Sequence, residues 1–360
     1  MSLQEIKHWV EHRERQLSSF ALVAGFIIDN LTFQRVDLFF DNLILFSYLG
    51  IAAFAITIIN LYEARVLRGR FFSWLHTWLP FVMQFVFGGL FSGFVVLYSR
   101  SASFIASWPF LLTLLGLLIG NEFFKKHYAR LNFHISILFV ALFSFMIFYV
   151  PVMLRKMGDN IFLLSGTISL FVMGIFLWLL SFVIPAQMRK SKGLLSLSIG
   201  GIFLLINILY FANIIPPIPL SLKDAGIYHS VSRSATGYVV LDEDRPWYEA
   251  FLSYSTIHIL RGEPLYVFSA VFAPTKLTTQ VFHNWQYYDE RKGEWVSVSR
   301  TSFPITGGRD GGYRGYSLKQ RISPGWWRVD IETKRGQLIG RVKFWVEQID
   351  TKPPLRSKER

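Results

Sequence analysis

Two short motifs in the C-terminal third of the chain contain residue types that are common in catalytic and binding sites. His283 and Trp285 lie two residues apart, and histidine is the commonest metal-binding side chain. No second histidine or carboxylate follows at ligand spacing nearby, so a buried histidine with a satisfied hydrogen bond is favoured over a metal site. The glycine-rich stretch 307–312 does not precede a helix, which excludes a phosphate-binding P-loop. It is interpreted as a mobile loop that could contact a ligand or a membrane.

A second set of residues combines tryptophan with basic side chains on two predicted strands, 326–333 and 338–347. Alternate residues of a strand point to opposite sides. One side is apolar and predicts a core, whereas the other mixes tryptophans with charges. If the strands pair as a hairpin across Arg335 and Gly336, the predicted ligand-binding residues are Trp326, Arg328, Arg341, Lys343 and Trp345. Three interpretations remain open: packing against loops, docking on a membrane surface, and a platform for sugar rings.

The N-terminal half contains ionisable residues beside long apolar segments. Charge inside a bilayer is costly and usually marks a cavity, a proton relay or a substrate path. These residues lie near predicted helix ends, however, where water is within reach, so an interfacial position is the simpler interpretation. The predicted polar cluster consists of Asp29, Arg35, Asp37, Asp41 and Glu122. The sequence contains no GxSxG, HExxH or Walker motif, so no catalytic residue is predicted.

The composition excludes further classes of site and partner. The 360 residues include no cysteine, which rules out disulfides, thiolate metal sites and a cysteine nucleophile. The net charge of +13 is spread over both halves, with 16 basic against 9 acidic residues up to residue 216 and 21 against 15 beyond it. The excess is therefore no nucleic-acid-binding arm, and attraction to anionic lipid accounts for it. No cofactor and no metal are expected.

Long apolar segments occupy residues ~17 to ~213, and a spanning helix needs about 20 such residues. Seven spans are predicted, at 17–33, 38–61, 74–98, 104–123, 131–154, 161–184 and 194–214. The first is the weakest, because it is short and has Asp29 and Asn30 near its end, and it could be re-entrant or interfacial. No cleavable signal peptide is expected, since the first 16 residues mix acids with bases.

The loop charges predict the orientation of these spans. The N-terminus and the loops near 62–73, 124–130 and 185–193 hold twelve basic residues, whereas the opposite loops hold four. By the positive-inside rule the N-terminus is cytoplasmic, and an odd number of spans places the C-terminal domain outside. If the first segment does not span, the C-terminal domain is still outside.

The periodicity changes from helical to alternating after a proline-rich junction at 217–224. Eight strands are predicted, at 237–241, 256–260, 265–272, 277–288, 294–303, 313–321, 326–333 and 338–347. The expected fold is therefore a membrane all-α bundle at 1–216, followed at 225–348 by an all-β antiparallel sandwich, Ig-like in class. Residues 349–360 are expected to form a frayed, charged tail.

Four stretches of the chain, at 25–38, 213–232, 283–289 and 315–331, resemble a bacterial family. Its members are inner-membrane proteins that pair a multi-span region with a C-terminal domain of unknown function, family 2914. The resemblance implies a Gram-negative envelope protein with a periplasmic β-domain. It implies no activity, so no site residue is transferred.

A non-enzymatic role is the preferred functional hypothesis. The β-domain would bind an envelope glycan, a lipid headgroup or a periplasmic protein, and the helices would anchor it or respond to it. The alternative is a transporter or lipid-handling protein that uses the polar cluster. A membrane enzyme acting on a polyprenyl or phospholipid substrate has only scattered acidic residues and histidines to support it.

Overall fold

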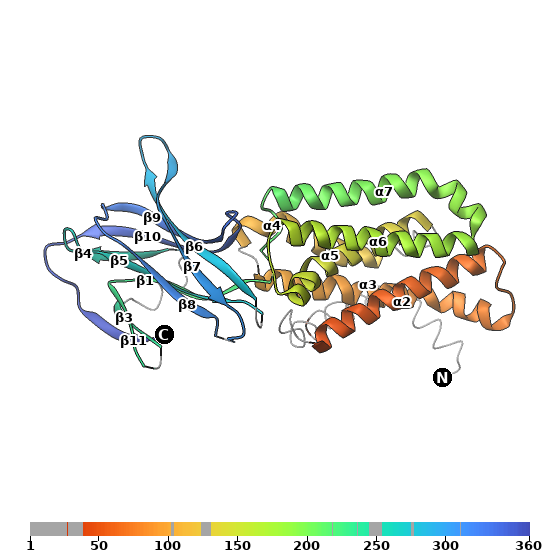
Figure 1. The fold of residues 1–360 in the computed structure, drawn as a ribbon, viewed down its shortest axis with the longest axis horizontal. Coiled ribbons are helices and arrows are strands. Elements are labelled where there is room, and N and C mark those ends of the chain that lie inside the picture. The colour runs from red at the N-terminus through yellow and green to blue at the C-terminus, as the bar shows by residue number, and fades with distance from the viewer. Residues whose placement is uncertain are drawn as a thin grey trace. The chain divides into compact units, whose positions relative to one another are not determined.

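The computed structural model describes residues 27, 39–101, 104–123, 131–217, 219–235, 237–244, 254–274, 277–309 and 311–360 (Figure 1). The chain divides into two compact units, one made of the helices and one that contains the strands. Apart from Ile27, the predicted first span at 17–33 lies outside the described residues, and so do Asp29, Arg35 and Asp37 of the predicted polar cluster.

Six helices of the helical unit coincide with six of the predicted spans. They are α2 (Phe39–Glu63), α3 (Arg70–Ser101), α4 (Phe104–Phe123), α5 (Leu131–Leu154), α6 (Asp159–Val183) and α7 (Pro185–Phe211). Five of them, α2, α3, α5, α6 and α7, are long and apolar enough to cross a membrane. Helix α7 begins earlier than its apolar stretch, because Pro185 suits the first turn of a helix and the basic residues that follow continue it.

Helix α5 is the centre of the helical unit. Its residues are mostly buried, and it packs against α2, α6 and α7. Phe143 of α5 stacks on Phe203 of α7, with ring centroids 5.7 Å apart. Gly89 of α3 lies against α2, where an added Cβ would come within 2.6 Å of the Tyr48 ring. A glycine is thus required for this close approach between two helices.

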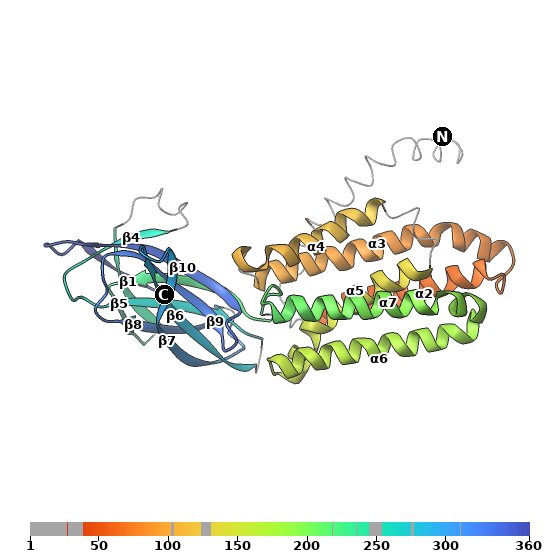
Figure 2. The ribbon, with the colours of Figure 1, turned by 90° about the horizontal axis from the view of Figure 1, so that it is seen from above.

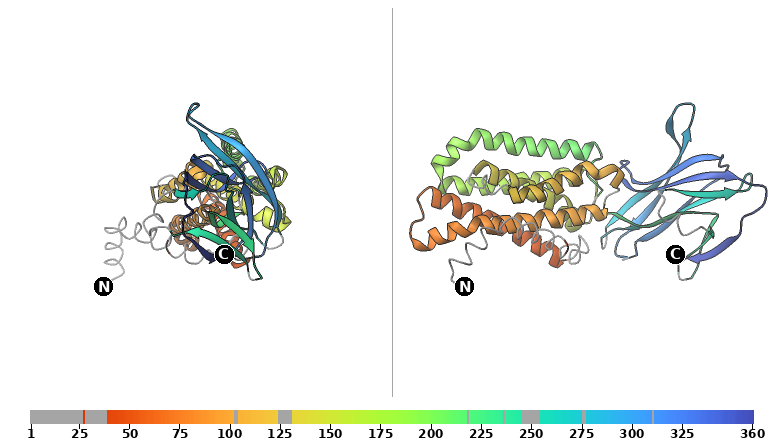
Figure 3. Two further views of the ribbon diagram at one scale, coloured as in Figure 1. Left: turned by 90° about the vertical axis from the view of Figure 1, so that its left-hand side faces the viewer. Right: turned by 180° about the vertical axis from the view of Figure 1, so that it is seen from behind.

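Helices α6 and α7 lie next to each other (Figure 2), and their exposed sides carry apolar side chains. Large hydrophobic side chains on these helices remain exposed, among them Phe171, Trp178, Phe182, Leu197 and Leu204. Exposed apolar surface of this extent is costly in water and is typical of helices that face lipid. The turns α2–α3 and α6–α7 lie at the same end of the unit, which the view from behind also shows (Figure 3).

In the described residues of the second unit, eleven strands form three sheets (Figure 1). The five-stranded sheet has the order β4-β10-β9-β6-β7, and the three-stranded sheets have the orders β1-β5-β8 and β11-β3-β2. The strands are β1 (Ser221–Tyr228), β2 (Ser230–Arg233), β3 (Tyr238–Glu243), β4 (Ser255–Ile259), β5 (Leu265–Phe272), β6 (Thr278–Asp289), β7 (Glu294–Thr306), β8 (Tyr313–Lys319), β9 (Gly325–Thr333), β10 (Leu338–Gln348) and β11 (Leu355–Glu359).

All eight predicted strands are present, but the structure differs from the prediction at four places. Strand β2 has no counterpart among the predicted strands, and it pairs with β3. Strand β1 begins inside the expected junction and pairs with β5. Residues 349–360 do not form a frayed tail, since β11 pairs with β3 and Arg360 exchanges backbone hydrogen bonds with Tyr238. Strand β4 pairs in parallel with β10, so the five-stranded sheet is mixed and not purely antiparallel.

The core of this unit lies between the sheets β4-β10-β9-β6-β7 and β1-β5-β8. It contains inward-facing side chains of both, namely Ile227, Ile257, Ile259, Leu265, Val267, Trp285, Trp327, Val329, Phe344 and Val346. His283 of β6 is fully buried beside this core. Its Nε2 lies 2.8 Å from the hydroxyl of Ser269, and its Nδ1 lies 2.9 Å from the hydroxyl of Ser317. The prediction of a buried, hydrogen-bonded histidine is confirmed.

We expect residues 216–360 to fold alone as a soluble all-β unit, because the strands bury a core of their own. A shorter fragment, 225–348, lacks part of β1 and all of β11, and it should be less stable by several kcal/mol, at about 1 kcal/mol per lost hydrogen bond. Circular dichroism and thermal unfolding of both fragments test this. A helical spectrum of the longer fragment, or equal stability of the two, would contradict it.

Candidate binding face on the five-stranded sheet

The outer face of the five-stranded sheet follows from strand alternation. In β9, Trp327 and Val329 point into the core, so Trp326 and Arg328 stand on the opposite side. The hairpin register places Trp345 opposite Trp326, Lys343 opposite Arg328, and Arg341 opposite Asp330. The turn between the strands contains Gly336 at φ +86°, a conformation that favours glycine. The structure therefore brings the five predicted ligand-binding residues together on one face.

Four aromatic side chains form a line across this face, here called the aromatic row: Trp345, Trp326, Tyr288 and Trp295. Tyr288 pairs with Trp295, and it follows Tyr287, which pairs with Trp327. The rings of Trp326 and Trp345 pack edge to face at 5.2 Å, and those of Tyr288 and Trp295 lie 5.2 Å apart. Each strand from β10 to β7 thus contributes one ring at the same level of the sheet.

Two cations stand next to the aromatic row, and we call Lys343 and Arg328 the cationic pair. Lys343 Nζ lies 4.5 Å from the ring centre of Trp326, and the Arg328 guanidinium lies 4.4 Å from that of Trp295. Arg328 Nε also donates to Gln286 Oε1 at 2.7 Å. Burial and the nearby charge of Arg341 lower the pKa of Arg328, although Asp330 opposes this. Among the described residues, neither cation of the pair forms an ion pair.

Two residues further along the strands, the charged side chains of the face neutralise each other within the protein. Arg341 makes a two-pronged ion pair with Asp330, with Nε–Oδ1 at 2.5 Å and Nη2–Oδ2 at 2.8 Å. Arg300 of β7 donates to Glu332 at 2.8 Å and to the carbonyl oxygen of Thr333 at 3.1 Å. Since Asp330 and Glu332 are buried, these cations balance internal charge. Of the predicted residues, Arg341 is therefore the one least free to bind a ligand.

Sequence reasoning missed the half of the face that lies on β6 and β7. Tyr288, Trp295 and Arg300 belong to it by register. Strand β7 carries a bulge, because Trp285 pairs with Ser299 whereas Gln286 pairs with Ser297. One extra residue shifts the alternation, so Trp295 and Arg300 share a face although their spacing is odd. Alternation from Trp295 alone would have placed Arg300 on the wrong side.

A second polar cluster joins β3, β4 and the β1–β2 connection. Glu243 Oε1 lies 2.8 Å from His229 Nε2, and Glu243 Oε2 lies 2.8 Å from His258 Nδ1. Burial raises the pKa of Glu243, but the hydrogen bonds from His229 and His258 outweigh it, so the pKa lies below its usual value. In the described part of the chain, no group of His, Asp and Glu has the geometry to hold a metal ion. This cluster ties strands together.

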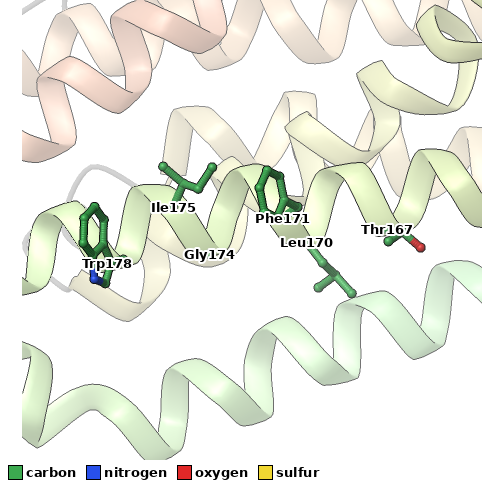
Figure 4. A pocket seen from close by; sticks show the side chains of 6 residues that line it. All are labelled: Thr167, Leu170, Phe171, Gly174, Ile175 and Trp178. Carbon is green, nitrogen blue, oxygen red and sulfur yellow. The ribbon is translucent and has the colours of Figure 1, made fainter.

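The helical unit shows no comparable site in its described part. Asp41 is buried in the first turn of α2, and Glu122 lies in the last turn of α4, a helix that is not a main packing partner of α2. A shallow depression is lined by residues of α6 alone (Figure 4): Thr167, Leu170, Phe171, Gly174, Ile175 and Trp178. It is apolar and open, as expected of a lipid-facing helix surface.

Comparisons with known proteins find a family model that matches part of the chain. Residues 278–346 match the model of a protein family of unknown function, DUF2914. The match runs from β6 into β10 and contains the whole aromatic row and the cationic pair. No curated protein matches the chain. Among solved structures, the alkylpurine DNA glycosylase AlkC from Pseudomonas fluorescens matches at 11% sequence identity. The match covers 87% of this chain and 99% of that one. Its TM-score of 0.23 is too low to indicate a shared fold.

Proposed function

We propose that this chain, which carries a DUF2914 segment at residues 278–346, is a membrane-anchored binding protein of the bacterial inner membrane. Its β unit recognises a component of the envelope through the outer face of the five-stranded sheet, and its helices hold that unit at the membrane. The observation that carries the proposal is the aromatic row beside a cationic pair that has no acidic partner among the described residues. Aromatic rings and unpaired cations on one surface suit ligands that have both apolar faces and negative charge.

The anchoring role rests on the helical unit. Five helices have the length and hydropathy of membrane spans, and their exposed sides are apolar. With α4 and the segment at 17–33, the number of spans becomes seven. The β unit, with two sheets over a common core, fits an Ig-like sandwich whose five-stranded sheet has gained one parallel edge strand.

The orientation rests on the distribution of charge. The turns α2–α3 and α6–α7 lie at one end of the helical unit (Figure 3), and basic residues gather beside them: Arg65, Arg68, Arg70, Arg189, Lys190 and Lys192. By the positive-inside rule this end faces the cytoplasm. The N-terminus is then cytoplasmic and the β unit periplasmic.

The orientation has a direct test. A reporter enzyme that is active only outside the cytoplasm should be active when fused after Arg360, because α7 leads outward into the β unit. Fused within the α6–α7 turn at Ile184, it should be inactive. Activity at Ile184 with none at Arg360 would invert the topology and contradict the periplasmic placement.

The binding face is tested by removing two rings of the aromatic row. Trp345→Ala and Trp295→Ala should each weaken binding to isolated envelope fractions by about tenfold or more, since losing about 1.4 kcal/mol of contact changes an affinity tenfold. Tyr316→Ala is the matched control, because Tyr316 is an exposed aromatic on the other sheet. Co-sedimentation of the full chain in nanodiscs with polysaccharide, lipid and protein fractions gives the affinities. Equal losses in all three variants would contradict the proposal.

A further inference from the structure

The cationic pair has an electrostatic requirement that the described protein leaves unmet. Lys343 and Arg328 lie opposite each other on neighbouring strands, but their charged groups turn to different rings, that of Lys343 to Trp326 and that of Arg328 to Trp295. One level further along the same strands, Arg341 faces Asp330 and is neutralised by it. The face thus provides ion-pair partners for Arg341 and Arg300 but, among the described residues, none for the cationic pair. An acidic group beside either cation would accept a charge-assisted hydrogen bond from it.

The aromatic row has the dimensions of a short chain of rings. Neighbouring strands are about 4.8 Å apart, so the four rings from Trp345 on β10 to Trp295 on β7 extend over about 14 Å. The cationic pair lies two residues further along its strands, and its charged groups reach back over the row, 4.5 Å from the ring centre of Trp326 and 4.4 Å from that of Trp295. A ligand that crosses the strands along the row therefore has cations along one side. This geometry fits a linear polymer of small rings with acidic groups on its edge.

The surface around the row argues against insertion into lipid. Trp345, Trp326, Tyr288 and Trp295 are all half-buried, and the ring planes are inclined by 71° between Trp326 and Trp345 and by 57° between Tyr288 and Trp295. The exposed large hydrophobic residues that the structure describes in this unit are Tyr254, Val298, Tyr316 and Leu318, and the ring of Tyr254 lies against the row, 4.9 Å from that of Trp326. A membrane-binding face would instead need exposed apolar side chains that enter the headgroup region. A row of half-buried rings with charged and polar edges suits sugar rings.

We propose that the outer face of the five-stranded sheet binds a linear acidic glycan that crosses the strands, stacks on the aromatic row and places acidic groups beside Lys343 and Arg328. This inference rests on the proposed function and narrows it to one ligand class. The neutralised level formed by Arg341, Asp330, Arg300 and Glu332 borders the site and fixes Arg328 through Gln286.

The test uses the full chain in nanodiscs of phosphatidylcholine, a lipid without net charge. Three probes are compared: a linear oligogalacturonate of about ten sugars, a neutral malto-oligosaccharide of the same length, and vesicles that contain phosphatidylglycerol. We expect the acidic glycan to bind about tenfold or more tightly than the neutral one, and its binding should weaken as the salt concentration rises. Lys343→Ala should abolish this preference, whereas Lys334→Ala, which removes an exposed lysine from the β9–β10 turn, should preserve it.

Each other result contradicts the inference in a distinct way. Binding to anionic vesicles without binding to the acidic glycan would overturn the glycan ligand but leave the proposed envelope-binding function intact. Equal affinity for the neutral and acidic glycans would remove the role of the cationic pair. Equal losses in Lys343→Ala and Lys334→Ala would show that attraction to net charge alone drives binding. Absence of binding to all three probes would overturn the inference, and the envelope fractions described above then decide the proposed function separately.

Discussion

The β unit should lose stability as the pH falls below about 6.5, with His283 as the main cause. Burial lowers the pKa of His283 from 6.5 to about 3. The unfolded chain therefore binds a proton at His283 between these pH values, while the native state does not. The contribution of His283 to the free energy of unfolding is fully present above pH 6.5 and is lost as the pH falls towards 3. The loss is about 1.4 kcal/mol per pH unit and about 5 kcal/mol in total.

The cause of this cost is visible in the packing. His283 is fully buried, and both ring nitrogens are within hydrogen-bond distance of the serine hydroxyls of β5 and β8. A hydroxyl can act as donor or acceptor, so the neutral ring is satisfied on both sides. A protonated ring would carry a buried charge, and neither serine supplies a compensating negative charge.

The measurement is urea unfolding of residues 216–360 at pH 7.0, 6.0 and 5.0, for the natural sequence and for His283→Gln. The variant should be less stable at pH 7, because it disturbs the serine contacts, but its stability should change less with pH. The chosen range excludes Glu243, whose lowered pKa maintains its contribution above pH 4.5 and loses it only under more acidic conditions. Parallel pH profiles for the two proteins would show that His283 is not the responsible group.

The sequence predicted those parts of the fold that local patterns determine. Hydropathy alone located α2 to α7, because a bilayer requires long apolar runs. Alternation and a short turn with Gly336 predicted the β9–β10 hairpin and its register. The prediction failed where pairing is non-local. The segment of strand β11 was predicted as a charged tail, because its exposed residues lack an apolar face. It forms a strand through its pairing with β3.

The residues of the candidate site were likewise predictable only where local patterns determine their position. Trp326, Arg328, Lys343 and Trp345 could be found because they belong to one hairpin. Their neighbours on β6 and β7 could not, because the order β9-β6-β7 brings together strands that are separated in the chain. The pairing of Arg341 with Asp330 was equally hidden, although both residues lie in that hairpin, because a charge pattern does not say which cation an acid will neutralise. The sequence therefore predicts the same ligand-binding role for Arg341 and Lys343. In the structure Asp330 neutralises Arg341, whereas Lys343 has no ion-pair partner among the described residues.

Neighbouring residues of β10 provide the second large effect, since they point to opposite sides of the sheet. Phe344 is fully buried in the core, where its ring meets Trp285 edge to face at 6.3 Å. Phe344→Ala should reduce the free energy of unfolding by about 3–5 kcal/mol, because it removes a large side chain and leaves a cavity. Trp345 is half-buried on the outer face and packs edge to face against Trp326. Trp345→Ala should cost less, about 1–2.5 kcal/mol, because it loses partial burial and one aromatic pair but leaves no internal cavity.

The comparison of these two variants decides whether the outer face is a surface or part of the interior. Urea unfolding of residues 216–360 gives both free energies, and the envelope-binding assay gives both affinities. We expect Phe344→Ala to lose stability and to bind normally wherever it remains folded, whereas Trp345→Ala should remain stable and bind weakly. If Trp345→Ala lost as much stability as Phe344→Ala, Trp345 would be a core residue. The aromatic row would then be internal packing, and no ligand could reach it.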